Sequence, residues 1–452
     1  MRRLLLLSIF VFLFLLNVKS QNYGWVQATE VSNMPVAISN NAVTEGYAND
    51  TAYMYSFGGI DSTKIWSGIN KKSFRYNTSS DVWDTIPDLP NTNAVIAAGA
   101  NYVDSIIYIM GGYQVLPNGN EISSNTVNRF DPRTNTYLSD GANIPVATDD
   151  HVQAVYRDSL IYLITGWSNT GNIPNVQIYD PANDNWLTGT SVPNNNTYKS
   201  FGATGIIIDN TIYYHGGANT GTNFPGQSTL RIGQIDSNDP TQIVWSTQSS
   251  NHISYRAVTI YDSWTHRPSF IGGSETTYNY NGISYNGSVG VSPKGRSLSF
   301  SSYQPNSYEI GNNSNMVNLF NNVYDTILPM DLRGVAFQFH YDHYIAGGML
   351  RNQKVSNKTF RLTIFHAMSV GESNKTVSFQ LYPNPTSEKI NLVFKIKENR
   401  TIRLINVVGK EVLKTNTNTT NLQLDVSPYP KGIYFVKVTT DKDSSSQKII
   451  IQ

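Results

Sequence analysis

One short pattern recurs six times along this 452-residue chain: an aromatic or aliphatic run that ends in two small residues, as in YMYSFGG (53–59) and IYIMGG (107–112). The copies end at Gly59, Gly112, Gly166, Gly217, Gly273 and Gly348. Successive copies lie 53, 54, 51, 56 and 75 residues apart. Self-similarity at a period near fifty residues constrains the fold to an array of like units. The aromatic and β-branched composition of the pattern predicts one strand per copy.

Each unit carries a second signal, in which a turn rich in Asp, Asn and Pro separates two aromatic residues. It is clearest in FDPRTNTY (130–137) and IYDPANDNW (178–186). Proline fixes φ, and Asn and Asp tolerate left-handed angles, so this signal predicts a tight hairpin. A run of small apolar residues, such as AVIAAGA (94–100), precedes the glycine-ended strand and suits a strand near a crowded axis. Four antiparallel strands per unit, repeated around an axis, predict an all-β propeller.

These motifs together resemble the kelch family of repeat propellers over roughly residues 22–365. The resemblance implies that VWDTIPDLP (82–90) and VYDTILPM (323–330) are outer strands of different blades. It also implies that aromatic residues of the outer strands fill the wedges between neighbouring blades. These residues are Trp83, Tyr137, Trp186, Trp245 and Tyr324. The six glycine pairs predict a six-bladed propeller.

The two ends of the repeat region complement one another. The last unit stops after KTFRLTIF (358–365), which leaves it without an outer strand. The N-terminal segment GWVQATEVSNMP (24–35) has the Trp and the closing Pro of an outer strand but no unit before it. We therefore expect the segment around Trp25 to pair with the strand at Phe360 and close the ring, which removes exposed sheet edges.

The fifth unit is about twenty residues longer than the others. Its extra length falls within 276–320, a stretch rich in Tyr, Asn, Gly and Ser. Long loops in compact folds need a reason, so we expect an added hairpin or a functional loop there.

The composition changes at a polar linker, 366–376, and residues 377–452 then alternate between apolar and polar, which predicts a small antiparallel β-sandwich. Four motifs follow in order there: YPNP (382–385), VVGKEV (407–412), GIYFVKV (432–438) and a terminal strand led by Lys448. Together they closely resemble the C-terminal sorting domain of the type IX secretion system. The resemblance implies a Gram-negative bacterium, the type IX machinery as a partner, and a final location in the medium or on the outer cell surface.

Residues 1–20 have the pattern of a cleaved secretory signal peptide, with two Arg, an apolar run of thirteen residues and small residues before Gln21. That run is too short to cross a bilayer comfortably, and no later stretch is longer, so we expect no transmembrane segment. The chain has no Cys, which excludes a disulfide framework and a thiolate metal site. A formal net charge of +1 creates no field that favours nucleic acid.

In a propeller, the loop entering each inner strand and the loop leaving each glycine pair lie on one face, called here the loop face. The polar and aromatic residues at these places are Asn93, Asp149, Asp150, His151, Lys199, Arg256, Arg333, Asp61, Tyr113, Trp167, Glu275 and Arg351. Polar groups with aromatic rings around a central depression suit a carbohydrate-like ligand. The candidate ligand-binding residues selected from this set are Asp149, His151, Trp167, Arg256, Glu275 and Arg333.

Structural interpretations compete with this one. Arg256 and Arg333 each precede small apolar residues, and an Arg at that place in kelch units often bonds loop carbonyls. The Asp149–His151 triplet offers metal ligands or acid–base groups, but it also suits a solvated loop start. Trp167 suits packing between blades as well as stacking on a ligand.

No catalytic motif appears in the sequence. The absence of Cys excludes the copper chemistry of galactose-oxidase-like kelch enzymes, and the scattered His residues predict no zinc site, so we expect no metal or cofactor. The sequence therefore favours an exported binding module that recognises a glycan or a protein. The alternative is a carbohydrate-active enzyme similar to the six-bladed kelch sialic-acid mutarotases, with Glu275 as proton donor and Arg256 or Arg333 as carboxylate clamp.

Overall fold

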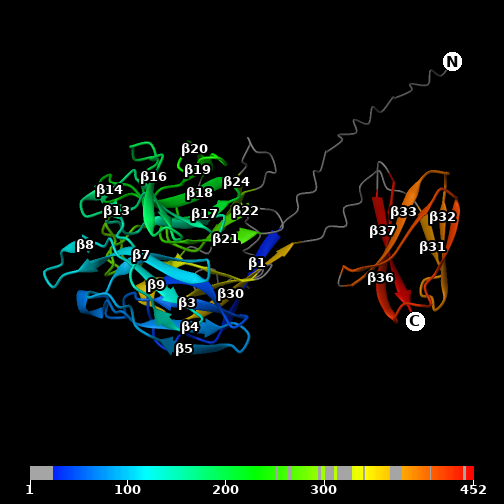
Figure 1. Ribbon diagram of the computed structural model, residues 1–452, viewed down its shortest axis with the longest axis horizontal. Helices are drawn as coiled ribbons and strands as arrows, with labels where there is room; N and C mark the ends of the chain where they lie inside the picture. The colour runs from blue at the N-terminus through cyan, green and yellow to red at the C-terminus, as the bar shows by residue number, and fades with distance from the viewer. Residues whose placement is uncertain are drawn as a thin grey trace, which may run out of the picture. The chain divides into compact units, whose positions relative to one another are not determined.

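The computed structural model describes residues 24–250, 252–262, 267–293, 297–300, 310–312, 328–338, 342–366, 379–407, 409–440 and 444–452. The predicted signal peptide and linker residues 367–376 lie outside this part of the chain. The described residues belong to two compact units, one within 23–367 and the other within 368–452. In Figure 1 the first unit runs from blue to yellow and the second from orange to red.

Six antiparallel sheets of four main strands each, counted over the described residues, form the blades of a propeller in the first unit. From the innermost strand outward, blades one to three are β2 (Ala42–Ala48), β3 (Thr51–Phe57), β4 (Ser73–Asn77), β5 (Val82–Ile86); β6 (Ile96–Val103), β7 (Ile106–Val115), β9 (Val127–Asp131), β10 (Thr136–Tyr137); and β11 (Val152–Tyr156), β12 (Leu160–Ile164), β15 (Val176–Asp180), β16 (Asn185–Gly189). Blades four to six are β17 (Phe201–Ile208), β18 (Thr211–Ala218), β19 (Thr229–Ile235), β20 (Ile243–Ser249); β21 (Val258–Asp262), β22 (Arg267–Ile271), β23 (Ser297–Phe300), β24 (Ile310–Asn312); and β26 (Ala336–Gln338), β27 (Asp342–Ala346), β30 (Thr359–His366), β1 (Gly24–Val31).

Short elements supplement the blades. They are β8 (Glu121–Ser123), β13 (Trp167–Ser168), β14 (Gly171–Asn172), β25 (Arg333–Gly334), β28 (Met349–Leu350), β29 (Lys354–Val355) and the 3-10 turns η1 (Trp66–Gly68) and η3 (Arg351–Gln353). β25 pairs with β2 in parallel, so the start of the sixth blade is tied directly to the first.

The N-terminal strand closes the ring as predicted. β1 lies antiparallel beside β30, with Trp25 opposite Phe365 and Glu30 opposite Phe360 (Figure 1). The sixth blade therefore takes its outer strand from the start of the chain and its other three strands from the end of the repeat region. This pairing covers the edge of β30, which would otherwise offer unpaired backbone groups to other chains.

Tryptophans on the outer strands join neighbouring blades, which confirms their predicted wedge position. Each indole Nε1 donates a hydrogen bond to a backbone carbonyl just beyond the outer strand of the preceding blade. The pairs are Trp83 to Ser32 (2.8 Å), Trp186 to Ala142 (2.8 Å) and Trp245 to Thr190 (3.0 Å). Each Trp indole thus fills the space between two twisted sheets, and its single N–H donates to a carbonyl at the outer edge of the neighbouring blade.

The fifth blade differs from the prediction. Its outer strand is β24, because β24 pairs with β23, and not the segment 323–330. The first part of the predicted insertion, residues 276–293, precedes the hairpin of β23 and β24 in the chain. Residues 323–327, including Tyr324, lie outside the described part of the chain.

The second unit is a sandwich of two antiparallel sheets, as predicted. The sheets are β31 (Phe379–Tyr382), β32 (Lys389–Phe394), β35 (Asn421–Asp425) and, in spatial order, β34 (Glu411–Thr417), β33 (Arg400–Asn406), β36 (Gly432–Thr439), β37 (Ser444–Ile451). Alternate side chains of both sheets, such as Leu392, Ile402 and Val436, form a core that is fully buried. This unit therefore has a hydrophobic core of its own.

Candidate functional site

Six residues at the entries to the inner strands adopt left-handed backbone angles, with φ between 47° and 66°. They are Asn40, Ala97, Asp150, Gly202, Arg256 and Asp331, one from each blade. Only one of them is glycine, and a positive φ is unfavourable for the others. The recurrence of this conformation in all six blades indicates a shared structural requirement.

The left-handed conformation at these positions accompanies hydrogen bonds between neighbouring blades. Donor first, they are Asn40 N to Asp331 O (3.1 Å), Ala97 N to Asn40 Oδ1 (3.1 Å), Asp150 N to Ala97 O (3.1 Å), Gly202 N to Asp150 O (2.8 Å), Arg256 N to Gly202 O (2.8 Å) and Leu332 N to Arg256 O (3.0 Å). The links pass from blade to blade and return to the start, so we call them the axial ring. The axial ring draws the six entries together at the loop face.

A buried ion cluster sits at the axial ring. The Arg256 guanidinium binds Asp150 through two atoms, Nε at 3.2 Å and Nη2 at 2.6 Å, and binds Asp331 through Nη1 at 2.9 Å. All three side chains are at most 3 % exposed. The guanidinium also lies over the rings of Tyr255 and Tyr278, at 5.1 and 5.6 Å from their centroids. Its donors and its faces are therefore occupied by the protein.

The electrostatics of this cluster keep Arg256 charged. Burial alone lowers the pKa of Arg256, but the nearby carboxylates of Asp150 and Asp331 outweigh that effect and hold this pKa well above its ordinary value. Asp331 also accepts a hydrogen bond from the Ser39 hydroxyl. An arginine with two carboxylate partners therefore links blades three, five and six at the axis.

The first part of the predicted insertion covers the axial ring. Residues 275–293, called here the capping loop, place Tyr278 and Tyr285 in an aromatic cluster with Phe201 and Phe224. Tyr285 and Phe224 have ring centroids 4.7 Å apart, and the Thr277 hydroxyl donates to the Phe224 carbonyl at 2.7 Å. The capping loop thus packs firmly against blade four, next to its own blade.

The capping loop also reaches the opposite side of the axis. The Gln353 side chain donates a hydrogen bond to the Gly282 carbonyl. Lys64 Nζ donates in turn to the Gln353 carbonyl at 3.1 Å, which connects the capping loop with blades six and one. Contacts on both sides of the axis make this loop a cover over the ion cluster.

The structure brings only some of the predicted site residues together. Arg256, Arg333 and His151 meet at Asp150, the residue between the predicted Asp149 and His151. The Asp149 carboxylate instead accepts a hydrogen bond from the Ser123 hydroxyl at 2.5 Å. Burial and then the charge of Asp150 raise the pKa of Asp149 well above its ordinary value.

The two remaining predicted residues lie away from this meeting point. Trp167 makes edge-to-face contacts with Phe201 and Phe224, at centroid distances of 5.5 and 5.7 Å, as the packing interpretation expects. Glu275 lies in a shallow hollow beside Ser288–Pro293 on the capping loop. The six predicted residues therefore do not line one open depression on the loop face, and their role in ligand binding stays a prediction.

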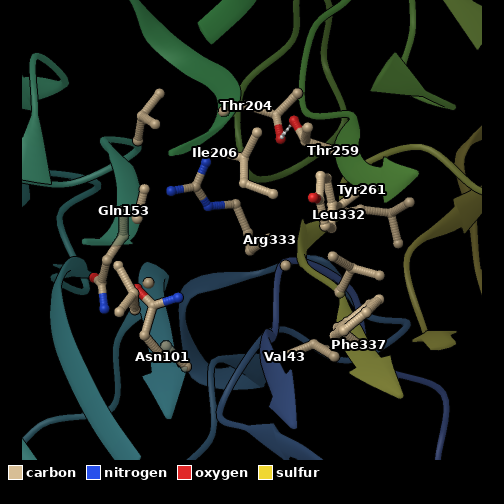
Figure 2. Close-up of a pocket in the computed structure, with 18 of the residues that line it drawn as sticks. Val43, Asn101, Gln153, Thr204, Ile206, Thr259, Tyr261, Leu332, Arg333 and Phe337 are labelled. Atoms are coloured by element: carbon tan, nitrogen blue, oxygen red, sulfur yellow. Dashed lines mark hydrogen bonds between the residues drawn. The ribbon is translucent and has the colours of Figure 1, made fainter. Parts of the chain in front are cut away.

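A cavity of about 280 Å³ lies along the axis between the inner strands. All six blades contribute lining residues, from β2, β6, β11, β17, β21 and the segment 332–337. Figure 2 shows Arg333 extending into this space between Gln153 and Ile206. The cavity extends from His151 and Arg333, next to the axial ring, to Asn101, Tyr261 and Phe337, near the turns that join the first two strands of each blade.

Polar side chains in the cavity retain hydrogen-bonding capacity. Arg333 Nη2 donates to the His151 carbonyl at 2.8 Å and Nη1 lies 3.4 Å from Asp150, but its buried Nε has no hydrogen-bond partner among the described residues. His151 Nε2 lies 3.0 Å from Gln153 Oε1, while Nδ1 has no partner in the same part of the chain. Asn101 Oδ1 is a third buried atom for which the described residues supply no partner. Buried polar atoms are normally satisfied, so these three suit contact with a polar ligand.

The charge states in the cavity follow from burial. Burial lowers the pKa of His151 to about 4, so its imidazole is neutral near pH 7 and offers both a donor and an acceptor. Glu45 accepts a hydrogen bond from the Phe337 amide at 3.1 Å, and burial raises the pKa of this carboxyl. Arg333 and Glu45 therefore give the cavity one cationic and one acidic side chain.

Sequence analysis overlooked most of this cavity, because it searched only the loops at the ends of the strands. The missed residues lie within the inner strands and include Glu45, Asn101, Gln153, Thr204 and Thr259. A usable signal existed, since each is a polar residue within a run of otherwise small or apolar residues. Alternation along a strand directs such a residue towards the axis.

Comparisons with known proteins agree with both units. A family model described as "Secretion system C-terminal sorting domain" matches residues 380–452. The kelch-like protein terF of Aspergillus terreus is 27% identical over 178 residues, which are 37% of this chain and 37% of that protein. The human Kelch-like protein 15 is 27% identical over 115 residues, which are 25% of this chain and 18% of that protein. The chain thus spans well under half of the length of these relatives.

A solved structure supports the fold. The structure of YjhT covers 74% of this chain and 99% of its own, with a TM-score of 0.54 and 14% sequence identity. This chain is a kelch-repeat propeller with a C-terminal secretion sorting domain. The sorting domain confirms the predicted link to type IX secretion, so this kelch propeller is secreted or held at the cell surface. Among its described residues, no helix is long and apolar enough to cross a membrane.

Proposed function

We propose that this exported kelch propeller binds a small glycan, about one sugar residue in size, in the axial cavity. The observation that carries the proposal is the set of three unpartnered polar atoms on Asn101, His151 and Arg333 in a cavity of about 280 Å³. Pockets for small ligands start near this volume and combine apolar walls with a few fixed polar groups. The motif analysis adds export from a Gram-negative bacterium by way of a signal peptide.

The arrangement favours a sugar over a protein partner. The polar atoms lie between the inner strands, where a folded partner has no access but a single sugar ring fits. Arg333 supplies a donor, Asn101 an acceptor and neutral His151 either, which matches hydroxyl groups that both donate and accept. Ile206, Leu332 and Phe337 provide apolar walls for the carbon faces of the ring.

The test is binding of the purified secreted protein to a glycan array, followed by calorimetry with each sugar that binds. Arg333→Met is expected to weaken binding at least about tenfold, because a hydrogen bond to a charged group contributes about 1.5–3 kcal/mol. Asp150 keeps Arg256 as a partner in this variant, so the fold is retained. The matched control is Arg351→Met, which changes an exposed Arg on the loop face. Equal affinity of both variants and the wild type would refute the cavity as the site.

One observation favours a second function, a sugar isomerase similar to the kelch mutarotases. Glu45, with its raised pKa, lines the same cavity as Arg333, and a perturbed acid beside a cation is typical of catalytic sites. In this alternative Glu45, in place of the predicted Glu275, exchanges the proton and Arg333 binds an acidic group of the sugar. NMR measurement of the exchange between sugar anomers separates the two functions. Acceleration by the wild type and not by Glu45→Gln supports the isomerase, and equal rates with and without protein exclude it.

A further inference from the structure

The sorting domain has an outer sheet surface that its core does not explain. In β36, Tyr434, Val436 and Val438 face the core and are buried, while the alternate residues Ile433 and Phe435 are 43% and 41% exposed. The solvent face of an antiparallel sheet is expected to alternate to polar residues. Ile433 and Phe435 break that expectation at the centre of the sheet.

Strand register extends this apolar area to both neighbours of β36. Ile405 of β33 lies opposite Phe435, and Ile450 of β37 lies opposite Ile433. Directly opposed residues on adjacent strands share one face of a sheet. We call Ile405, Ile433, Phe435 and Ile450 the outer apolar patch.

Basic residues flank the outer apolar patch on the same face. Lys448 lies opposite Phe435, while Arg403 lies between Lys414 and Lys437 in the adjoining row. The acidic residue placed on this face by the same register is Glu411, whose Oε2 pairs with Arg403 Nε at 3.0 Å. Four cations and one carboxylate leave this face with a net charge of +3 over the described residues.

We propose that this face of β34, β33, β36 and β37 is the surface by which the sorting domain docks onto an acidic protein surface of the secretion machinery. The proposal rests on the sorting role of residues 380–452. An exposed apolar centre with a charged rim is the usual anatomy of a protein interface. The excess positive charge specifies a partner surface rich in Asp and Glu, since complementary potentials guide encounter and fix register.

The other sheet of the sandwich provides a matched control. Lys389 on β32 is exposed like Lys448, but it lies opposite Asp425. Charge reversal at Lys389 therefore changes the net charge of the domain by two units, as reversal at Lys448 alone does, without touching the proposed face. If charge reversal lowers export on one sheet and not on the other, the effect depends on the proposed face and not on the net charge of the domain.

The experiment expresses the full chain in a bacterium that has the type IX machinery and measures the fraction exported, with periplasmic retention as the complement. The variants are Lys448→Glu, Lys437→Glu/Lys448→Glu, Ile433→Thr/Phe435→Thr, Lys389→Glu, and a chain without residues 380–452. We expect export to fall in Lys448→Glu and to fall about tenfold in both double variants, because like charges or lost apolar contact disfavour docking, and to stay unchanged in Lys389→Glu. Thermal unfolding of each purified chain that keeps residues 380–452 confirms that the sandwich remains folded.

The outcomes separate the docking face from the sorting role. Normal export of the chain without 380–452 refutes the sorting role itself. Loss of export in that chain but normal export of both folded double variants refutes the docking face alone. If the wild type binds vesicles of anionic lipid and the charge variant does not, the face binds a membrane. If the wild type dimerises and the charge variant does not, the face binds a second copy of the chain. Either result also overturns the proposal.

Discussion

Replacement of Arg256 by Met tests whether the buried ion cluster holds the propeller together at its axis. The change removes the cation that binds Asp150 and Asp331 and keeps a side chain of comparable length. Asp150 retains Arg333, with Nη1 at 3.4 Å, but Asp331 loses its cation within a site that is fully buried. An unpaired buried carboxylate is the main cost of this variant.

The size of the effect follows from burial. Breaking a buried ion pair by removing one partner costs about 3–5 kcal/mol. The lost contact of the guanidinium with Tyr255 and Tyr278 adds to this, since a desolvated cation–π contact contributes about 2 kcal/mol. Packing of the new Met against the same rings recovers part of that contribution. We therefore expect the free energy of unfolding to fall by about 3–5 kcal/mol.

Tryptophan fluorescence during urea unfolding measures this change, because all seven Trp precede residue 265 and report on the propeller alone. The control is Arg133→Met, which breaks an Arg–Asp pair of the same two-atom geometry, with both contacts to Asp131 at 3.0 Å. The Arg133 side chain is 54% exposed, so solvent screens this pair and its loss is expected to cost far less stability than the loss of Arg256. Similar losses in the two variants would refute the argument that burial makes the Arg256 cluster strong.

Three further predictions concern other parts of the propeller. The folded state keeps the proton of Asp149 at pH values where the unfolded chain has released it, so the free energy of unfolding falls as pH rises from about 4 towards neutral. In urea titrations Asp149→Asn is expected to flatten the slope of this free energy against pH, and an unchanged slope contradicts the prediction. In Gly99→Ala the new Cβ would lie 2.2 Å from Gln153 Oε1, so we expect a loss of about 1–3 kcal/mol in the same titration together with weaker ligand binding, and wild-type behaviour in both contradicts the cavity geometry. Ala28→Pro on β1 is expected to lower the melting temperature and expose the edge of β30, which light scattering detects as aggregation; a monomer with wild-type stability would show that closure contributes little.

The sequence allowed the blade count and the ring closure to be predicted, because both depend on local patterns. The glycine-ended strands recur at a regular spacing and with a similar composition. The segment 24–35 has the sequence pattern of an outer strand, which can be recognised without knowing its partner strand. The outer strand of the fifth blade was misassigned for the same reason. VYDTILPM matched the pattern of an outer strand, yet β24 at Ile310–Asn312 occupies that place in the sheet.

The site could be predicted only in part, because its contacts join residues far apart in the chain. Arg256 and Asp150 are separated by 106 positions, and Arg333 and the His151 carbonyl by 182. Sequence analysis selected both arginines but assigned them to loop carbonyls or a ligand, and it could not pair either with Asp150. Charge partners of this kind depend on which blades meet at the axis.

The axial ring explains why the proposed ligand site lies between the inner strands and not among the loops. The ring requires a positive φ even at Ala97 and Arg256, where this angle is unfavourable, so the ring hydrogen bonds must offset that cost. The same bonds, together with the capping loop, fill the axis at the loop face and leave the cavity to the strands beneath it. Changes in these loops should therefore alter stability, whereas changes at Asn101, Gln153 or Arg333 should alter which ligand binds.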